Sequence, residues 1–193
     1  MQLMCMFTSM ESDMLMNYNE CIEKYGSDYQ LKKNLREGNI YMAEKGIYST
    51  DEFPSELSII TFRYPKAVLT GDSAFFYHGL TDVIPDLYHL ATRRTDSRIR
   101  DKRVIQSFIS DGLFDKGISE ISYNNDTVRI YSLERMLIEL MRFKARYPRD
   151  YYKEILSSYR TKLYDMDFGL IEEYAAAFSN GSYLMEMIDT EVI

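Results

Sequence analysis

The sequence predicts an α+β protein with a small N-terminal module, a short-stranded sheet and a C-terminal helix cluster. Three observations favour this class. Two short helical segments near the N-terminus are followed by a β-prone hairpin, the middle of the chain alternates with a period of two, and the period changes to 3.6 after Ser132. With 193 residues, 46% hydrophobic and 27% charged, the chain can bury a substantial core and is not typical of disordered or fibrous proteins.

The first predicted domain, residues 1–55, opens with a Met-rich leader, residues 1–16. Four leader residues lie at helical spacing and are compatible with a short amphipathic helix: Leu3, Phe7, Met10 and Met14. The alternative is an unstructured leader, with Met14 or Met16 as the true initiator instead of Met1. The sequence leaves both interpretations open.

Two helices separated by a tight turn follow the leader. Asn19 can cap the first helix, and Gly26 supplies its left-handed end. Ser27 can cap the second helix, residues 28–37, which Gly38 ends.

A β-hairpin is predicted next, over residues 40–48, with its turn at Glu44, Lys45 and Gly46. The order of helix, tight turn, helix and small hairpin is that of a winged helix-turn-helix. This order predicts a DNA-binding module at the N-terminus.

The second predicted domain, residues 56–193, begins after a polar join at residues 51–55. It starts with a helix that ends before Pro65 and has an apolar stripe of Leu57, Ile60 and Tyr64. The predicted strands are residues 67–70, 87–92, 104–109, 118–123 and 127–131. Asp72 can cap a compact helix, residues 73–78, and the last two strands should form a hairpin around a three-residue turn, residues 124–126.

Three amphipathic helices form the predicted C-terminal cluster. Ser132 can cap the first, whose apolar stripe is Leu133, Met136, Leu137, Leu140 and Met141. Its other face carries Arg135, Glu139, Arg142 and Arg146. The second, residues 150–160, has a stripe of Tyr152, Ile155, Leu156 and Tyr159. Asp167 can cap the third helix, which runs through Phe178 and which Asn180 and Gly181 should stop.

The sequence contains few of the motifs that are typical of known classes of enzyme. His78 and His89 have no Cys or His at metal-ligand spacing, and the sequence has no Gly-x-Ser-x-Gly, Gly-rich phosphate loop or Glu-x-Lys motif. Asp165 and Asp167 lie upstream of Gly181 and Ser182, the reverse of the order a nucleotidyltransferase needs. The sequence motifs therefore predict no catalytic residue, no cofactor and no metal, and the alternative is an enzyme with an unrecognised site.

Charge and hydropathy place the protein in the cytoplasm without a membrane partner. No apolar run approaches the roughly 20 residues that cross a bilayer, no basic residue precedes Lys24, and Cys5 and Cys21 do not make a disulfide framework. The net charge of −7 argues against a protein that coats nucleic acid by charge alone. It leaves room for a local basic face.

The second helix is the predicted DNA-reading element. With Leu31 and Leu35 turned inward, Lys33 points outward at 100° per residue. The candidate DNA-binding residues of the module are Tyr29, Gln30, Lys32, Lys33 and Arg36, with Lys45 as the wing contact. Arg and Lys read guanine, Gln reads adenine and Tyr contacts the backbone. The alternative is an ordinary solvated helix face.

A second basic segment lies between two predicted strands. Residues 93–103 hold six Lys or Arg and two Asp, and the candidate phosphate contacts are Arg93, Arg94, Arg98, Arg100, Lys102 and Arg103. Arg suits phosphate because it donates two parallel hydrogen bonds. The alternative is a solvated loop that protects a sheet edge.

Several segments resemble AbiEi-type antitoxins, over roughly residues 20–160. Residues 26–48 resemble the family's winged-helix module, and residues 64–81 are similar to its "pro-lys-ala, ser-ala, his-gly-leu-thr" stretch. Residues 128–136 resemble its strand-to-helix "tyr-ser-x-glu-arg" step. The leader and the acidic tail after Lys162 depart from the pattern, and the module is shorter and more acidic than is usual in the family.

The resemblance implies a component of a toxin–antitoxin system that acts in phage defence by abortive infection. Such an antitoxin binds double-stranded DNA in its own promoter, represses transcription, and counters a toxin that resembles a nucleotidyltransferase. It is not itself an enzyme. The alternative is a stand-alone DNA-binding regulator or interaction module without a cognate toxin.

Overall fold

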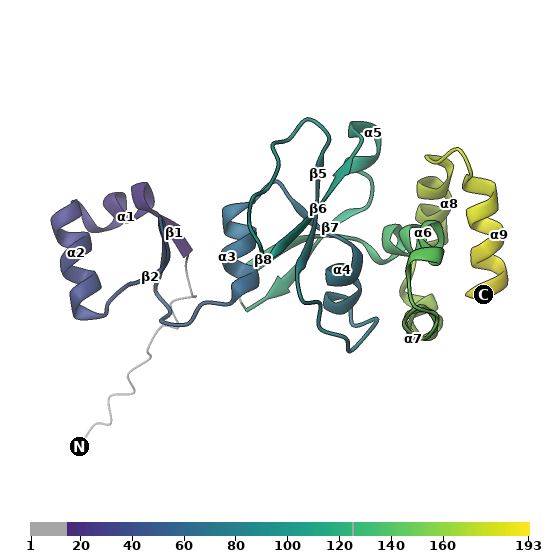
Figure 1. Ribbon diagram of the computed structural model, residues 1–193, viewed down its shortest axis with the longest axis horizontal. Coiled ribbons are helices and arrows are strands. Elements are labelled where there is room, and N and C mark those ends of the chain that lie inside the picture. The colour runs from purple at the N-terminus through teal and green to yellow at the C-terminus, as the bar shows by residue number, and fades with distance from the viewer. Residues whose placement is uncertain (1–14, 125) are drawn as a thin grey trace, which may run out of the picture. The chain divides into compact units, whose positions relative to one another are not determined.

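The computed structural model describes residues 15–124 and 126–193, and the chain divides into two compact units (Figure 1). Unit 1 runs to Pro65 and includes the hairpin tip Ser122–Thr127, and unit 2 comprises Lys66–Ile121 and Val128–Ile193. The predicted leader helix lies outside the described residues. The domain boundary predicted after residue 55 stays a prediction.

Unit 1 contains a three-stranded antiparallel sheet with two helices between its first two strands. The order is β1 (Leu15–Asn17), α1 (Tyr18–Tyr25), α2 (Asp28–Glu37), β2 (Tyr41–Glu44) and β3 (Ile47–Ser49). Strand β3 lies between β1 and β2 in the sheet. The predicted hairpin is present, and β1 is an additional strand that the pattern of the sequence did not indicate.

Capping residues fix the ends of α1 and α2. The Ser27 hydroxyl accepts the Gln30 amide, and Gly26 and Gly38 end the two helices in the left-handed region, as predicted. The prediction for Asn19 is wrong, because Asn17 caps α1 and forms a capping box with Glu20.

The core of unit 1 joins its sheet to both helices. It consists of four buried residues, Met16, Cys21, Leu31 and Ile40, with partly buried Ile22, Tyr25, Leu35 and Tyr48 packed around them. Helix α3 (Glu56–Arg63), capped by Ser55 and ending before Pro65 as predicted, also contacts β1 in this unit. The inward positions of α2 are therefore those that its periodicity predicted.

Unit 2 is built on a five-stranded mixed sheet with the strand order β6-β5-β4-β8-β7. Its strands are β4 (Val68–Leu69), β5 (Tyr88–Arg93), β6 (Val104–Ile109), β7 (Ile118–Tyr123) and β8 (Asp126–Tyr131). Strand β4 is antiparallel to β5 and parallel to β8, and β5 is parallel to β6. The predicted strands are confirmed within about one residue at most ends.

Two short helices belong to the sheet region, α4 (Gly71–Tyr77) and α5 (Asp111–Phe114). The prediction that Asp72 caps α4 is wrong, since Thr70 occupies the cap position and makes no side-chain cap bond. Asp72 lies in the first turn instead, where it accepts a hydrogen bond from the Tyr151 hydroxyl at 3.2 Å.

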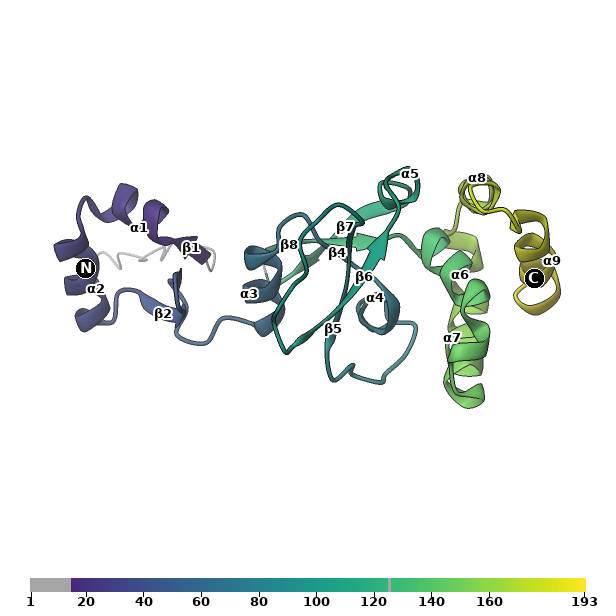
Figure 2. The same cartoon turned by 45° about the horizontal axis from the view of Figure 1, so that its top comes forward.

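The C-terminal helices form a cluster, as predicted, which Figure 2 shows from a second angle. Its members are α6 (Leu133–Arg142), η1 (Lys144–Arg146), α7 (Arg149–Lys162), η2 (Leu163–Asp165), α8 (Phe168–Ala176) and α9 (Gly181–Glu191). Ser132 and Asp167 cap α6 and α8 as expected. Helix α9 is new, because Gly181 begins a helix where the sequence suggested only an end.

The polar side chains of α6 differ from their predicted position on a second, outer face. Every residue from Glu134 to Met141 is buried, including Arg135 at 0% and Glu139 at 6% exposure. The reason is that α4, α8 and α9 all contact this helix. Helix α6 is therefore the centre of the cluster and has no solvated side along these residues.

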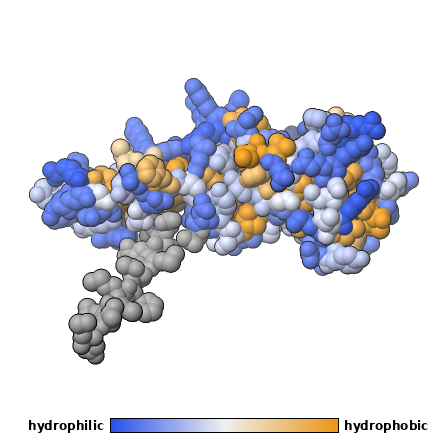
Figure 3. Space-filling model, turned by 90° about the horizontal axis from the view of Figure 1, so that it is seen from below, coloured by the Kyte–Doolittle hydropathy of each residue, from blue (hydrophilic) through white to orange (hydrophobic). Residues whose placement is uncertain are grey.

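Among the described residues, no helix combines the length and hydropathy that a bilayer-spanning segment requires. On the face of the molecule drawn in Figure 3, hydrophilic residues predominate and hydrophobic residues form separate patches. The exposed hydrophobic side chains in unit 2 include Val83, Ile84 and Phe108.

Candidate nucleic-acid interface

Helix α2 exposes the side chains that the sequence assigned to DNA reading. Leu31 is 2% exposed and anchors the helix, whereas Tyr29 is 68% exposed. The other candidates on this helix, Gln30, Lys32, Lys33 and Arg36, are also exposed. The structure thus presents donors of the kind that contact base edges and phosphates along one helix surface.

Salt bridges within the helix hold its lysines. Lys32 Nζ lies 2.7 Å from the Asp28 carboxylate, and Lys33 Nζ lies 3.8 Å from that of Glu37. The hydrogen bond to Asp28 raises the pKa of Lys32, and the same bond lowers the pKa of Asp28. Pairs this exposed contribute little to stability, so a phosphate can displace them at small cost.

Asp28, which is not among the candidate residues predicted from the sequence, contacts two helices. Its carboxylate also accepts a hydrogen bond from the Tyr18 hydroxyl of α1 at 3.3 Å, so it joins the two helices at their surface. The i,i+4 spacing of Asp28 and Lys32 was the available signal.

Lys45 lies at the turn between β2 and β3. Both Lys45 and Gly46 are exposed, and Gly46 adopts a positive φ of 81° that lets the chain reverse. Glu44 is ion-paired with Arg63 of α3. The lysine therefore stands at the tip of the hairpin next to a carboxylate that already has a partner.

The connector between β5 and β6, residues 94–103, carries the second predicted set. Because β5 and β6 are parallel, the connector must return along the sheet by the length of a six-residue strand, about 20 Å. Ten residues can span about 33 Å at most, so the connector is long enough for this return.

Two of the six connector-region cations are neutralised by nearby carboxylates. Arg93 donates to both oxygens of Asp115 at 2.5 and 2.6 Å, and its guanidinium lies 4.7 Å from the centroid of the Phe114 ring. The hydrogen bond to Asp115 raises the pKa of Arg93. Arg103 donates to Asp101 at 2.7 Å. Arg93 is the last residue of β5, and Arg103 directly precedes β6.

The other four cations, Arg94, Arg98, Arg100 and Lys102, are exposed. Within the described part of the chain, their side chains have no carboxylate partner. Their charges are therefore available to an outside anion. They belong to unit 2, whereas α2 belongs to unit 1.

Each of the two histidines lies close to an acceptor oxygen and is partly buried. His78 Nε2 lies 2.7 Å from the backbone oxygen of Tyr131, and burial lowers its pKa. His89 Nε2 is 3.7 Å from the Asp72 carboxylate, and burial lowers its pKa too. The Ser73 hydroxyl beside it accepts the His89 amide.

Residues 15–124 and 126–193 contain no group of three or more His, Cys, Asp or Glu side chains placed to hold a metal ion. Burial also raises the pKa of the Cys21 thiol, which disfavours the reactive thiolate.

No protein-family model matches this sequence, and no curated protein matches it.

Proposed function

We propose that this protein is an AbiEi-like antitoxin and autorepressor, which binds its own promoter DNA and counters a nucleotidyltransferase-type toxin. The observation that carries the DNA-binding part is α2, the second helix after a tight turn, with Tyr29, Gln30, Lys33 and Arg36 exposed over a buried Leu31. A helix enters the major groove of B-DNA, where such side chains distinguish base pairs.

The topology of unit 1 supports this assignment. Two helices joined at Gly26 and Ser27 are followed by the β2–β3 hairpin, the order of a winged helix-turn-helix. Leu31 and Leu35 of α2 and Tyr48 of β3 pack in one cluster, so the reading helix and the wing are fixed to a common core. A rigid scaffold of this kind keeps base-contacting side chains in register.

The antitoxin part is supported by contacts between the two resembling segments of unit 2. Residues 64–81 include β4 and α4, and residues 128–136 include β8 and the start of α6. Strands β4 and β8 are paired, with Leu69 opposite Ile130, and His78 of one segment bonds to Tyr131 of the other. Residues more than 50 positions apart in the chain are therefore in contact.

A binding assay tests the proposal. The full chain is titrated into a labelled duplex taken from the DNA upstream of its own reading frame, and into a shuffled duplex of equal length and composition, both at fixed salt. A specific repressor should bind the first duplex about 10³-fold or more tightly than the second. Equal affinity for the two duplexes would contradict autorepression.

The antitoxin part needs a separate readout. Co-expression of the chain with the toxin reading frame beside it should restore growth, and the Lys33→Ala/Arg36→Ala variant should still do so if unit 2 carries this role. Failure of the parent chain to restore growth would favour the stand-alone regulator.

A further inference from the structure

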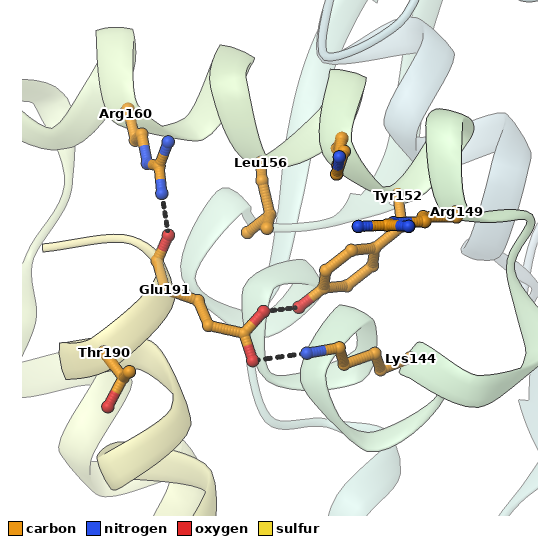
Figure 4. Close-up of a pocket in the computed structure, with 8 residues that line it drawn as sticks. Lys144, Arg149, Tyr152, Leu156, Arg160, Thr190 and Glu191 are labelled. Carbon is orange, nitrogen blue, oxygen red and sulfur yellow. Dashed lines mark hydrogen bonds and ion pairs between the residues drawn. The ribbon is translucent and has the colours of Figure 1, made fainter.

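A cationic pocket lies between α7 and α9 in unit 2, and none of the residues assigned to DNA lines it. Figure 4 shows its lining. The pocket has a volume of about 510 Å³, within the size range of small-molecule sites. Four cations line it, Lys144, Arg149, Lys153 and Arg160, against one carboxylate, that of Glu191.

Glu191 is an anion that the side chains of the pocket already bind. Lys144 Nζ approaches its carboxylate to 2.5 Å and the Tyr152 hydroxyl donates to it at 2.8 Å, while Arg160 donates to its backbone oxygen at 2.7 Å. The hydrogen bond from Lys144 and that from Tyr152 lower the pKa of Glu191, in spite of its partial burial. The pocket therefore already stabilises one negative charge.

Two further cations remain without an anion. Arg149 and Lys153 are exposed, and among the described residues neither side chain has a carboxylate partner. They lie four residues apart on α7, and Leu156 and Arg160 continue the same surface at the next turns. A single carboxylate cannot neutralise this array, which amounts to an excess of three positive charges.

We propose that this pocket binds a phosphate-bearing small molecule of nucleotide size. Guanidinium groups donate to phosphate through two parallel bonds, and the four cations match the charge of a polyphosphate. Buried Leu156 and Tyr152 supply an apolar wall for a part of the ligand that carries no charge. In the absence of ligand, Glu191 is the counter-ion of Lys144. When a phosphate binds, its negative charge takes the place of the Glu191 carboxylate beside Lys144.

Isothermal titration of the full chain with ATP, and separately with inorganic tripolyphosphate, tests the site. The Arg149→Ala/Lys153→Ala variant should lose about tenfold or more in affinity for both probes. Lys162→Ala is the matched control, since Lys162 lies at the end of α7 and does not line the pocket. Tighter binding of ATP than of tripolyphosphate would show that the base uses the apolar wall.

Glu191→Gln separates a ligand site from a merely structural ion pair. The amide keeps an oxygen for the Tyr152 hydroxyl but removes the charge, so affinity for both probes should rise, by about threefold to tenfold. No binding by the parent chain, or binding that neither variant changes, would overturn the proposal. A short single-stranded oligonucleotide that outcompetes both probes at this pocket would also overturn it in favour of nucleic-acid phosphates. The outcome does not depend on promoter binding, which the Lys33→Ala/Arg36→Ala variant tests.

Discussion

Helices α2 and α6 have the same length and similar sequence patterns, yet the charged side chains of α2 are exposed and most of those of α6 are buried. Each has ten residues, a Ser N-cap and an apolar stripe beside charged positions. In α2 Leu31 is the one buried residue, and the charges are exposed. In α6 eight consecutive residues are buried, among them Arg135 and Glu139.

The difference comes from the number of neighbours and not from the helix itself. A charge on a helix covered on several sides has no water to solvate it, so it must find a partner within the protein. Arg135 donates to Glu139 at 2.7 Å, and its guanidinium carbon lies 5.2 Å from the ring centroid of Tyr131 and 5.1 Å from that of Phe178. Arg142 donates to the second oxygen of Glu139. The charged side chains of α2 are exposed to solvent, and their ion pairs are with other exposed residues of the same helix. The charged side chains of α6 are paired inside the protein.

The largest expected effect is on this buried network. Glu139→Ala should lower the free energy of unfolding by about 3–5 kcal/mol, because it leaves the Arg135 guanidinium buried with no carboxylate. Urea unfolding followed by circular dichroism measures the change.

Arg135→Leu is the control for that variant. It removes the buried charge and also the Nε and Nη1 atoms, which have no hydrogen-bond partner within the described residues, while Glu139 keeps Arg142. Its loss of stability should therefore be smaller than that of Glu139→Ala. The reverse order would mean that packing of the arginine, and not charge pairing, holds α6.

The second prediction concerns exposed cations in the same unit as α6. Replacement of Arg94, Arg98, Arg100 and Lys102 by Ala should reduce the slope of log affinity for promoter DNA against log salt by about three to four. Each of the four has a charge available to phosphate. Anisotropy titrations over a range of salt concentrations measure the slope.

Arg93→Ala is the matched control, since Asp115 already neutralises its charge. This variant should leave the slope unchanged and lower stability instead. If the fourfold variant kept the slope of the parent, the connector would face solvent or the toxin and not DNA.

The sequence predicted those elements whose signals are local. Ser27 and Gly38 define α2 to the residue because a hydroxyl cap and a left-handed glycine act within one turn. The two-residue period similarly located β6 and β7. The exposed surface of α2 followed from the inward positions of Leu31 and Leu35.

Elements that depend on distant neighbours were missed. Strand β1 has three residues and exists through its pairing with β3, about 30 positions later. The sequence predicts that Gly181 stops a helix, but a Cβ there would lie 2.3 Å from the Ala175 oxygen, so glycine permits α9 to begin against the end of α8. The partner of Arg93, Asp115, is likewise 22 residues away.

The third prediction tests α2 as the reading helix. Lys33→Ala or Arg36→Ala should each reduce affinity for promoter DNA by about 1–3 kcal/mol and relax preference at one base pair, without a change in unfolding. Neither side chain belongs to the core of unit 1. Lys24→Ala, an exposed lysine on α1, should leave base preference intact. If the double variant bound promoter DNA as tightly as the parent chain, the exposed face of α2 would be an ordinary solvated helix face that does not read DNA.

The smallest expected effect is a difference between the two units in how their stability depends on pH. Burial lowers the pKa of His78 and His89, both in unit 2, and the sequence of unit 1 contains no histidine. As pH falls through about 6.5, the unfolded chain therefore takes up protons that the folded chain excludes. Stability from these groups is complete above that pH and decreases below it, down to the lowered pKa values.

Native-state hydrogen exchange of the full chain at about pH 7 and about pH 5.5, corrected for the intrinsic rates, measures this effect for each unit separately. The opening free energy at the Leu137 amide of α6 should decrease at the lower pH, while that at the Leu31 amide of α2 should stay constant. In His78→Gln the side-chain amide can still donate to the Tyr131 oxygen. This variant should therefore lose the part of the pH-dependent decrease that comes from His78 and keep the part that comes from His89. An equal decrease at both amides would assign the pH dependence to carboxylates, which both units contain. It would then not be the histidines that make the stability of unit 2 depend on pH in this range.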